Sequence, residues 1–190
     1  VSLTFQMQRP HPNVLWGDMC WPVEESPPVL SFYNQISQAL PDNLALYGTS
    51  SLLPLQNVSQ THPQHNLAHP QDGSVTETEG SILFTTVYNG DYNEGMQLLQ
   101  PFLTFQPTEW NPSYTSFVQF EKANGNATLV NHRNSYIKSG MILPGGLTAG
   151  AIKVFQDAIR NAPSINSSIL WDHSGGAIAR VCAALLTFPS

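Results

Sequence analysis

The sequence is short of charge, and of basic residues above all. Lys, Arg, Asp and Glu make up 11% of the 190 residues, under half of the ~25% that is usual in soluble proteins. The seven Lys and Arg residues form no cluster, and the formal net charge is −6. Because proteins bind nucleic acid through basic patches that neutralise phosphates, we expect no nucleic-acid partner.

Long apolar runs and several enzyme motifs are missing as well. No stretch reaches the ~18 apolar residues that a membrane span needs, so we expect no membrane association. The sequence contains neither a Gly-x-Ser-x-Gly nucleophile elbow nor a Gly-rich phosphate loop. Its Asp and Glu residues are scattered, which gives no support to a paired-carboxylate glycosidase site.

Cysteine is scarce, and Cys20 and Cys182 lie far apart in the sequence. A disulfide between them would close a long loop and stabilise the fold by about 4–5 kcal/mol in the chain-entropy model. The alternative is a pair of buried free thiols, and we favour this second interpretation.

Uncharged polar residues, mainly Asn, Gln, Ser and Thr, take the place of the missing charge. Such a surface is typical of secreted glycoproteins. Asn-x-Ser/Thr sequons occur at Asn57, Asn126 and Asn166, and we predict glycosylation there and a secreted, extracellular protein. The alternative is chance, since sequons arise easily in a chain rich in Asn and Ser.

Apolar periodicity predicts strands separated by single helices. The expected strands cover residues 3–7, 14–21, 44–53, 80–88 and 134–143 and the runs on either side of Gly175-Gly176, with weaker candidates at 116–120 and 128–132. Helices are expected from Pro27-Pro28 to about Leu40, after a cap at Asp91, and from Leu147 or Thr148 to about Asn161. Residues 105–116 look irregular.

This order of elements predicts a single α+β domain over residues 1–190, with a mainly antiparallel sheet and helices packed on one face. Residues 54–80 change in character: Gln, His, Pro, Asn, Ser and Thr dominate. We interpret them as a long polar loop within the domain.

Few residues suggest chemistry. His62, His65 and His69 have a metal-like spacing, but Pro63 and Pro70 prevent a helical face, so an ordinary polar loop is the better interpretation and we predict no metal site. His173 follows an apolar run and precedes Gly175-Gly176, where it could orient a substrate or act as an acid or base. The alternative is a structural, hydrogen-bonded histidine. Tyr136 and Trp171 could face a ligand or pack against the helices.

The last part of the sequence carries a family resemblance. Residues 171–181, read as WDHSGGAIARV, and then Leu186-Thr187-Phe188-Pro189 resemble the FAD-linked oxidases of the berberine-bridge-enzyme-like group, in the vanillyl-alcohol-oxidase superfamily. Other segments match family landmarks in the same order along the chain: residues 1–5, Trp16-Gly17, Trp21-Pro22, Leu40-Pro41-Asp42, residues 87–91 and residues 133–139.

The resemblance implies the substrate-binding portion of a secreted FAD-dependent oxidase. Such an enzyme passes a hydride from an alcohol, sugar or amine carbon to flavin, and a large antiparallel sheet roofs the isoalloxazine. It implies that Tyr136, Trp171 and His173 line the small-molecule substrate, and it leaves the catalytic residues unknown.

The family's FAD-binding domain lies mostly upstream of such a segment. Its flavin-attaching His and Cys have no match here, and Cys20 fits neither motif. We therefore expect companion polypeptide to bind most of the FAD and the isolated chain to be inactive. The alternative is a non-enzymatic secreted glycoprotein, with a binding, storage or structural role, derived from that fold.

Overall fold

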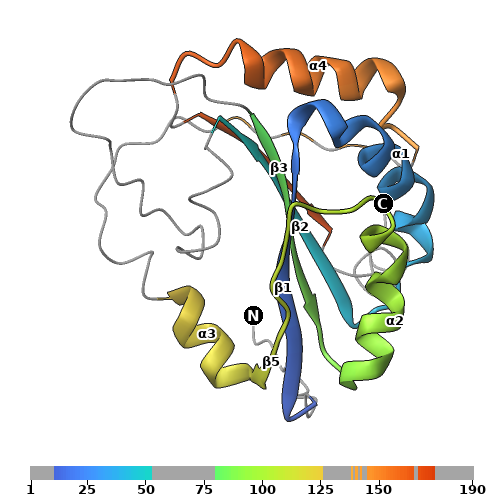
Figure 1. Cartoon of the computed structure of the whole chain (residues 1–190), viewed down its shortest axis with the longest axis vertical. Coiled ribbons are helices and arrows are strands. Elements are labelled where there is room, and N and C mark those ends of the chain that lie inside the picture. Colours follow the sequence, from blue (N-terminus) through green and yellow to red (C-terminus); the bar gives the residue numbers. More distant parts are fainter. Residues whose placement is uncertain are drawn as a thin grey trace, which may run out of the picture.

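A computed structural model describes residues 11–52, 80–125, 138, 140, 142, 145–164 and 167–173. Within them, six strands form one antiparallel sheet (Figure 1). Its strands are β1 Asn13–Pro22, β2 Leu44–Ser51, β3 Ser81–Tyr88, β4 Glu109–Trp110, β5 Ser113–Ser116 and β6 Ser168–His173. The helices are α1 Ser26–Ile36, α2 Tyr92–Leu103, α3 Phe117–Gly125 and α4 Ala149–Arg160, with 3-10 turns η1 Val23–Glu25 and η2 Ser37–Ala39. The predicted α+β fold with a mainly antiparallel sheet is confirmed.

The strands follow the order β4-β1-β3-β2-β6, and β5 also pairs with β1. Phe84 of β3 lies opposite Met19 of β1 on one side and Gly48 of β2 on the other. Gly48 in turn lies opposite Trp171 of β6. Since successive residues of a strand point to opposite faces, these positions all share one face of the sheet.

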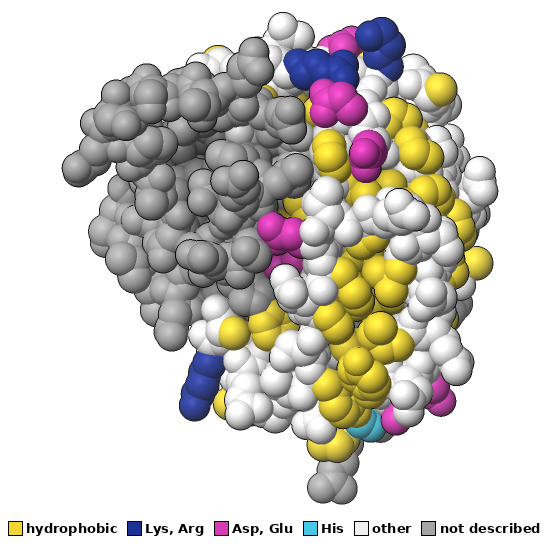
Figure 2. Space-filling model, in the orientation of Figure 1, with side chains coloured by type: hydrophobic (Ala, Val, Ile, Leu, Met, Phe, Trp, Pro, Cys, Tyr) yellow, Lys and Arg dark blue, Asp and Glu magenta, His cyan; other side chains and the backbone are white. Residues whose placement is uncertain are grey.

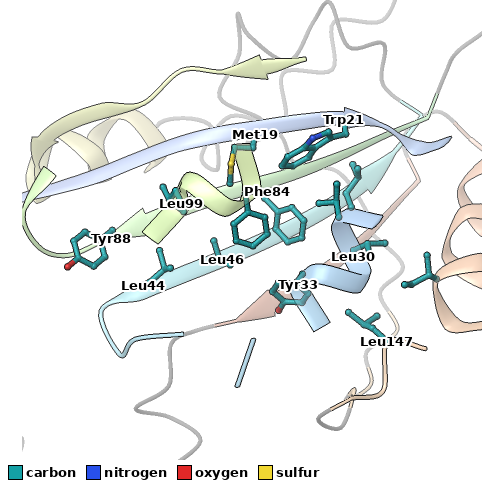
Figure 3. Close-up of a cluster of buried hydrophobic side chains, with 14 of the residues drawn as sticks. Met19, Trp21, Leu30, Tyr33, Leu44, Leu46, Phe84, Tyr88, Leu99 and Leu147 are labelled. Atoms are coloured by element: carbon teal, nitrogen blue, oxygen red, sulfur yellow. The ribbon is translucent and has the colours of Figure 1, made fainter. Parts of the chain in front are cut away.

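Helices α1, α2 and α4 cover that face and enclose the core (Figure 3). Tyr33 and Leu30 of α1 contribute to the same buried cluster as Phe84, and Leu99 joins it from α2. Each large apolar side chain that is fully buried stabilises the fold by roughly 1.5–3 kcal/mol. The core on this face therefore fixes the helices against the sheet.

The helix starts follow the sequence signals. The Asp91 carboxylate accepts hydrogen bonds from the amides of Asn93 (2.8 Å) and Glu94 (3.2 Å) and so begins α2. The Thr148 hydroxyl accepts from the Ala151 amide at 3.2 Å and begins α4. Both starts were predicted.

One predicted strand is wrong. Residues 116–120 do not form a strand, because β5 ends at Ser116 and α3 begins at Phe117. Ser116 and Gln119 cap each other reciprocally: the Ser116 hydroxyl accepts from the Gln119 amide at 3.3 Å, and Gln119 Oε1 accepts from the Ser116 amide at 3.3 Å. The region that looked irregular, 105–116, supplies the short strands β4 and β5.

Helix α3 lies on the other side of β1 from α2 (Figure 1). Its Phe120 ring meets the Trp16 ring edge-on at 5.6 Å, and Trp16 alternates with the core residue Leu15 along β1. The expected packing of helices on one face thus holds for α1, α2 and α4, while α3 contacts the opposite face.

Charged side chains are few on the face shown in Figure 2, where uncharged polar and apolar groups dominate. Helix α4 carries ion pairs from Lys153 to Asp157 (2.9 Å) and from Arg160 to Glu24 (3.2 Å). Such exposed pairs contribute about 0–1 kcal/mol each. Because these ion pairs contribute little, apolar packing stabilises the fold more than electrostatic interactions do.

Several predictions fall on residues that the structure leaves undescribed. These are the strands at 3–7 and 128–132, almost all of 134–143, the strand after Gly176, and the loop 54–80 except for Gly80. In the described ranges, no helix combines the length and the apolar character that crossing a membrane requires.

Candidate functional site

Strand β6 brings together two of the three residues predicted to bind substrate. Trp171 and His173 are two positions apart and pair with Gly48 and Leu46 of β2. Both side chains therefore lie on the face of the sheet that α1, α2 and α4 cover. The third residue, Tyr136, and the predicted glycosylation sites Asn57, Asn126 and Asn166 lie outside the described residues.

Trp171 occupies space that Gly48 leaves open. A Cβ atom on residue 48 would lie 1.9 Å from the Cε2 atom of Trp171, so the indole ring rests directly on the glycine. The Phe155 ring of α4 stacks against the indole at 6.2 Å and 28°, and the Phe84 ring meets it edge-on at 5.7 Å. These contacts agree with the packing alternative for Trp171, while its predicted role in substrate binding stays a prediction.

His173 lies against α1. The ring of Tyr33 stands perpendicular to the imidazole, with the centroids 6.4 Å apart. Burial lowers the pKa of His173 below its ordinary value. Burial, aided by the negative charge of Asp172, raises the pKa of Tyr33 to about 12. Burial therefore favours the neutral form of both rings.

The two β6 rings share an unusual feature: each has a buried nitrogen with no partner in the described part of the chain. Trp171 Nε1 and His173 Nε2 are closed to solvent, and no described residue forms a hydrogen bond with either atom. Two other indoles of the sheet have partners: Trp16 Nε1 donates to Thr115 Oγ1 and Trp21 Nε1 donates to the Phe105 carbonyl, both at 3.0 Å. A buried polar atom left unpaired costs roughly 1–3 kcal/mol, so a ligand that pairs with these atoms would recover that cost.

The opposite face of the sheet carries an acidic pair that the sequence did not indicate. Asp18 of β1 accepts a hydrogen bond from the Thr85 hydroxyl at 2.6 Å. Glu109 of β4 lies opposite Cys20, two residues along β1 from Asp18. Burial raises the pKa of Glu109, and the charge of Asp18 raises it further. Glu109 can thus hold a proton at a higher pH than an ordinary glutamate.

Cys20 lies near Asp18 and Glu109 and is a buried free thiol. A free thiol is the state favoured from the sequence, and Cys182 lies outside the described residues. Burial raises the pKa of Cys20 from 9.0 to about 12, with smaller contributions from the charges of Glu109 and Asp18. A thiol in this state forms almost no thiolate at neutral pH and is a poor nucleophile. It therefore does not suit covalent attachment of a flavin.

At Gly17, Gly48, Gly90 and Gly95, the protein's own atoms already fill the space that a Cβ would take, whereas Gly140 and Gly145 have no atom within 4 Å of that position. Within the described residues, no group of three or more His, Cys, Asp and Glu side chains could hold a metal ion. The metal-like spacing of His62, His65 and His69 falls outside them.

No protein-family model matches this chain, and no curated protein matches it either. Support for a function therefore comes from the sequence resemblance and from the geometry of β6.

Proposed function

We propose that this chain is the substrate-binding portion of a secreted FAD-dependent oxidase, with FAD held mainly by companion polypeptide. The observation that carries the proposal is the pair of buried ring nitrogens on β6 that have no hydrogen-bond partner among the described residues. They lie on the segment that the sequence resemblance assigns to the substrate side. Native proteins pair nearly all of their buried polar groups, so such exceptions indicate a bound partner or a function.

The surroundings of the two rings suit a binding role. Phe84, Phe155 and Tyr33 place aromatic rings around Trp171 and His173. Small-molecule sites commonly combine apolar and aromatic walls with a few polar groups that fix the orientation of the ligand. In this proposal Trp171 and His173 are those polar groups.

A flavin, when bound, supplies the hydride acceptor of such an enzyme. Because companion polypeptide holds the FAD in this proposal, no FAD contact is assigned to the described residues. In this proposal the described residues bind the substrate, orient it and exclude water from it.

Measurements on the protein purified in its native form distinguish an FAD-dependent oxidase from a non-enzymatic glycoprotein. We expect intact-mass analysis to show a companion chain and glycans, and the visible spectrum to show flavin that bleaches anaerobically with substrate. The isolated 190-residue chain should stay colourless after mixing with FAD and desalting. Flavin bound tightly by the isolated chain would contradict the division of labour, and native material without flavin or turnover would favour a non-enzymatic glycoprotein.

A further inference from the structure

We propose that the Asn89-Gly90 turn is a deamidation site, and that hydrogen bonds from His11 and Asn43 keep it closed while the protein is folded. Deamidation needs neither flavin nor a substrate, so it can be measured whatever the function of the chain is.

An asparagine that precedes glycine is chemically fragile, because glycine has no side chain to shield its amide nitrogen. At this turn the Gly90 nitrogen attacks Cγ of the Asn89 side-chain amide. The new bond joins Gly90 N to Cγ, the bond from Cγ to Nδ2 breaks, and ammonia leaves with the proton of the Gly90 nitrogen. A water molecule from the solvent then opens the succinimide ring and leaves aspartate or isoaspartate at position 89.

The turn lies between β3 and α2, and its main chain is anchored on both sides. The Asn89 amide donates to the Asn43 carbonyl at 2.8 Å, and Asn43 Nδ2 donates to the Asn89 carbonyl at 3.0 Å. This carbonyl belongs to the same planar peptide group as the attacking Gly90 nitrogen. The next carbonyl, that of Gly90, accepts from the Tyr114 hydroxyl at 3.2 Å. The Tyr88 ring packs so closely that a Cβ on Gly90 would lie 2.5 Å from its Cε1 atom.

The side chain that is attacked is held as well. The His11 amide donates to Asn89 Oδ1 at 3.0 Å. His11 is fixed by its own ring, whose Nδ1 atom lies 2.8 Å from the Asn13 carbonyl and 3.5 Å from the Tyr114 hydroxyl.

Ring closure brings two non-bonded atoms, Gly90 N and Asn89 Cγ, to the length of a covalent bond. The peptide group or the side chain therefore has to leave its partners. A donor that stayed on Oδ1 would stabilise the charge that develops on this oxygen. His11 cannot follow the oxygen without breaking the contacts of its ring, so we expect its hydrogen bond to slow the reaction.

The experiment follows deamidation of the 190-residue chain by peptide mapping with mass spectrometry, in mildly alkaline buffer with and without denaturing urea. Asn124-Gly125 is the second Asn-Gly pair of the sequence, and in urea the two pairs should react at comparable rates. His11→Pro removes the amide that donates to Asn89, and His11→Ala is the matched control that keeps it. Far-UV circular dichroism reports whether each variant is folded.

We expect Asn89 to react about tenfold more slowly, or slower still, in the folded chain than in urea, because several hydrogen bonds must be released. In the folded state His11→Pro should react about fivefold faster than His11→Ala, since one hydrogen bond is lost. Equal rates for Asn89 in the folded chain and in urea would overturn the proposal, as would a His11→Pro variant no faster than His11→Ala. If His11→Pro does not fold, Asn43→Ala removes the donor to the Asn89 carbonyl, and no acceleration in that variant would equally reject the proposal.

Discussion

Replacing Gly48 with alanine tests the packing of the Trp171 indole against the backbone of β2. The new Cβ would lie 1.9 Å from Cε2, 2.1 Å from Nε1 and 2.3 Å from Cζ2 of the indole, so the ring has to move. A tryptophan buries about 150–250 Å², which corresponds to about 4–6 kcal/mol at ~25 cal/mol per Å². Because the ring would shift and keep part of its burial, we expect Gly48→Ala to lower the free energy of unfolding by about 2–4 kcal/mol.

Urea unfolding followed by far-UV circular dichroism measures this loss without relying on tryptophan fluorescence. Gly150→Ala is the matched control: the nearest atom to its added Cβ is Thr148 Oγ1 at 3.8 Å. In an exposed helical position this change should stabilise the protein by up to about 1 kcal/mol.

A double-mutant cycle with Trp171→Ala isolates the contact. If the clash between the new Cβ and the indole causes the loss, Gly48→Ala should lower the free energy of unfolding much less in the Trp171→Ala background. The expected coupling energy is about 1–3 kcal/mol. A cost below about 0.5 kcal/mol in the otherwise unmodified chain, or the same cost with and without Trp171, would refute the reasoning.

Two further predictions concern titration. The pKa of His173 is lowered in the folded protein, so the unfolded chain takes up the proton first; stability should fall as the pH drops below about 6.5. In the His173→Gln variant, the urea midpoint should change less between pH 7 and pH 5 than in the unmodified chain. An equal change in the two proteins would contradict the role of His173. The pKa of Cys20, raised to about 12, predicts that its thiol resists Ellman's reagent until the protein unfolds; fast reaction in folded Cys182→Ser protein would show the opposite.

Much of the fold could be predicted from local patterns. The strand from Leu44 and the helix after Asp91 follow from apolar periodicity and a capping residue, signals that act over a few neighbours. Helix α3 was missed because the short run from Phe117 to Phe120 suits either a strand or a helix. The Ser116-x-x-Gln119 capping box was the signal that could have settled it.

The candidate site was predictable only in part. The sequence pointed to Trp171 and His173 but could not say which face of the sheet they occupy, because that depends on the register of β6 against β2. For the same reason it gave no sign that Gly48 makes room for Trp171 or that Glu109 comes close to Asp18. Such contacts join residues that are distant in the chain, and only the paired strands bring them together.

The pairing of β2 with β3 has a consequence for how this protein can change over evolution. Ser51, the last residue of β2, lies opposite Ser81, the first residue of β3, so the chain leaves the sheet and returns to it at adjacent points. The entropic cost of joining two such points rises by only about 0.6 kcal/mol for each doubling of the connection. This is where the chain can gain or lose residues at little cost to folding, and so where related proteins would be free to differ most in length.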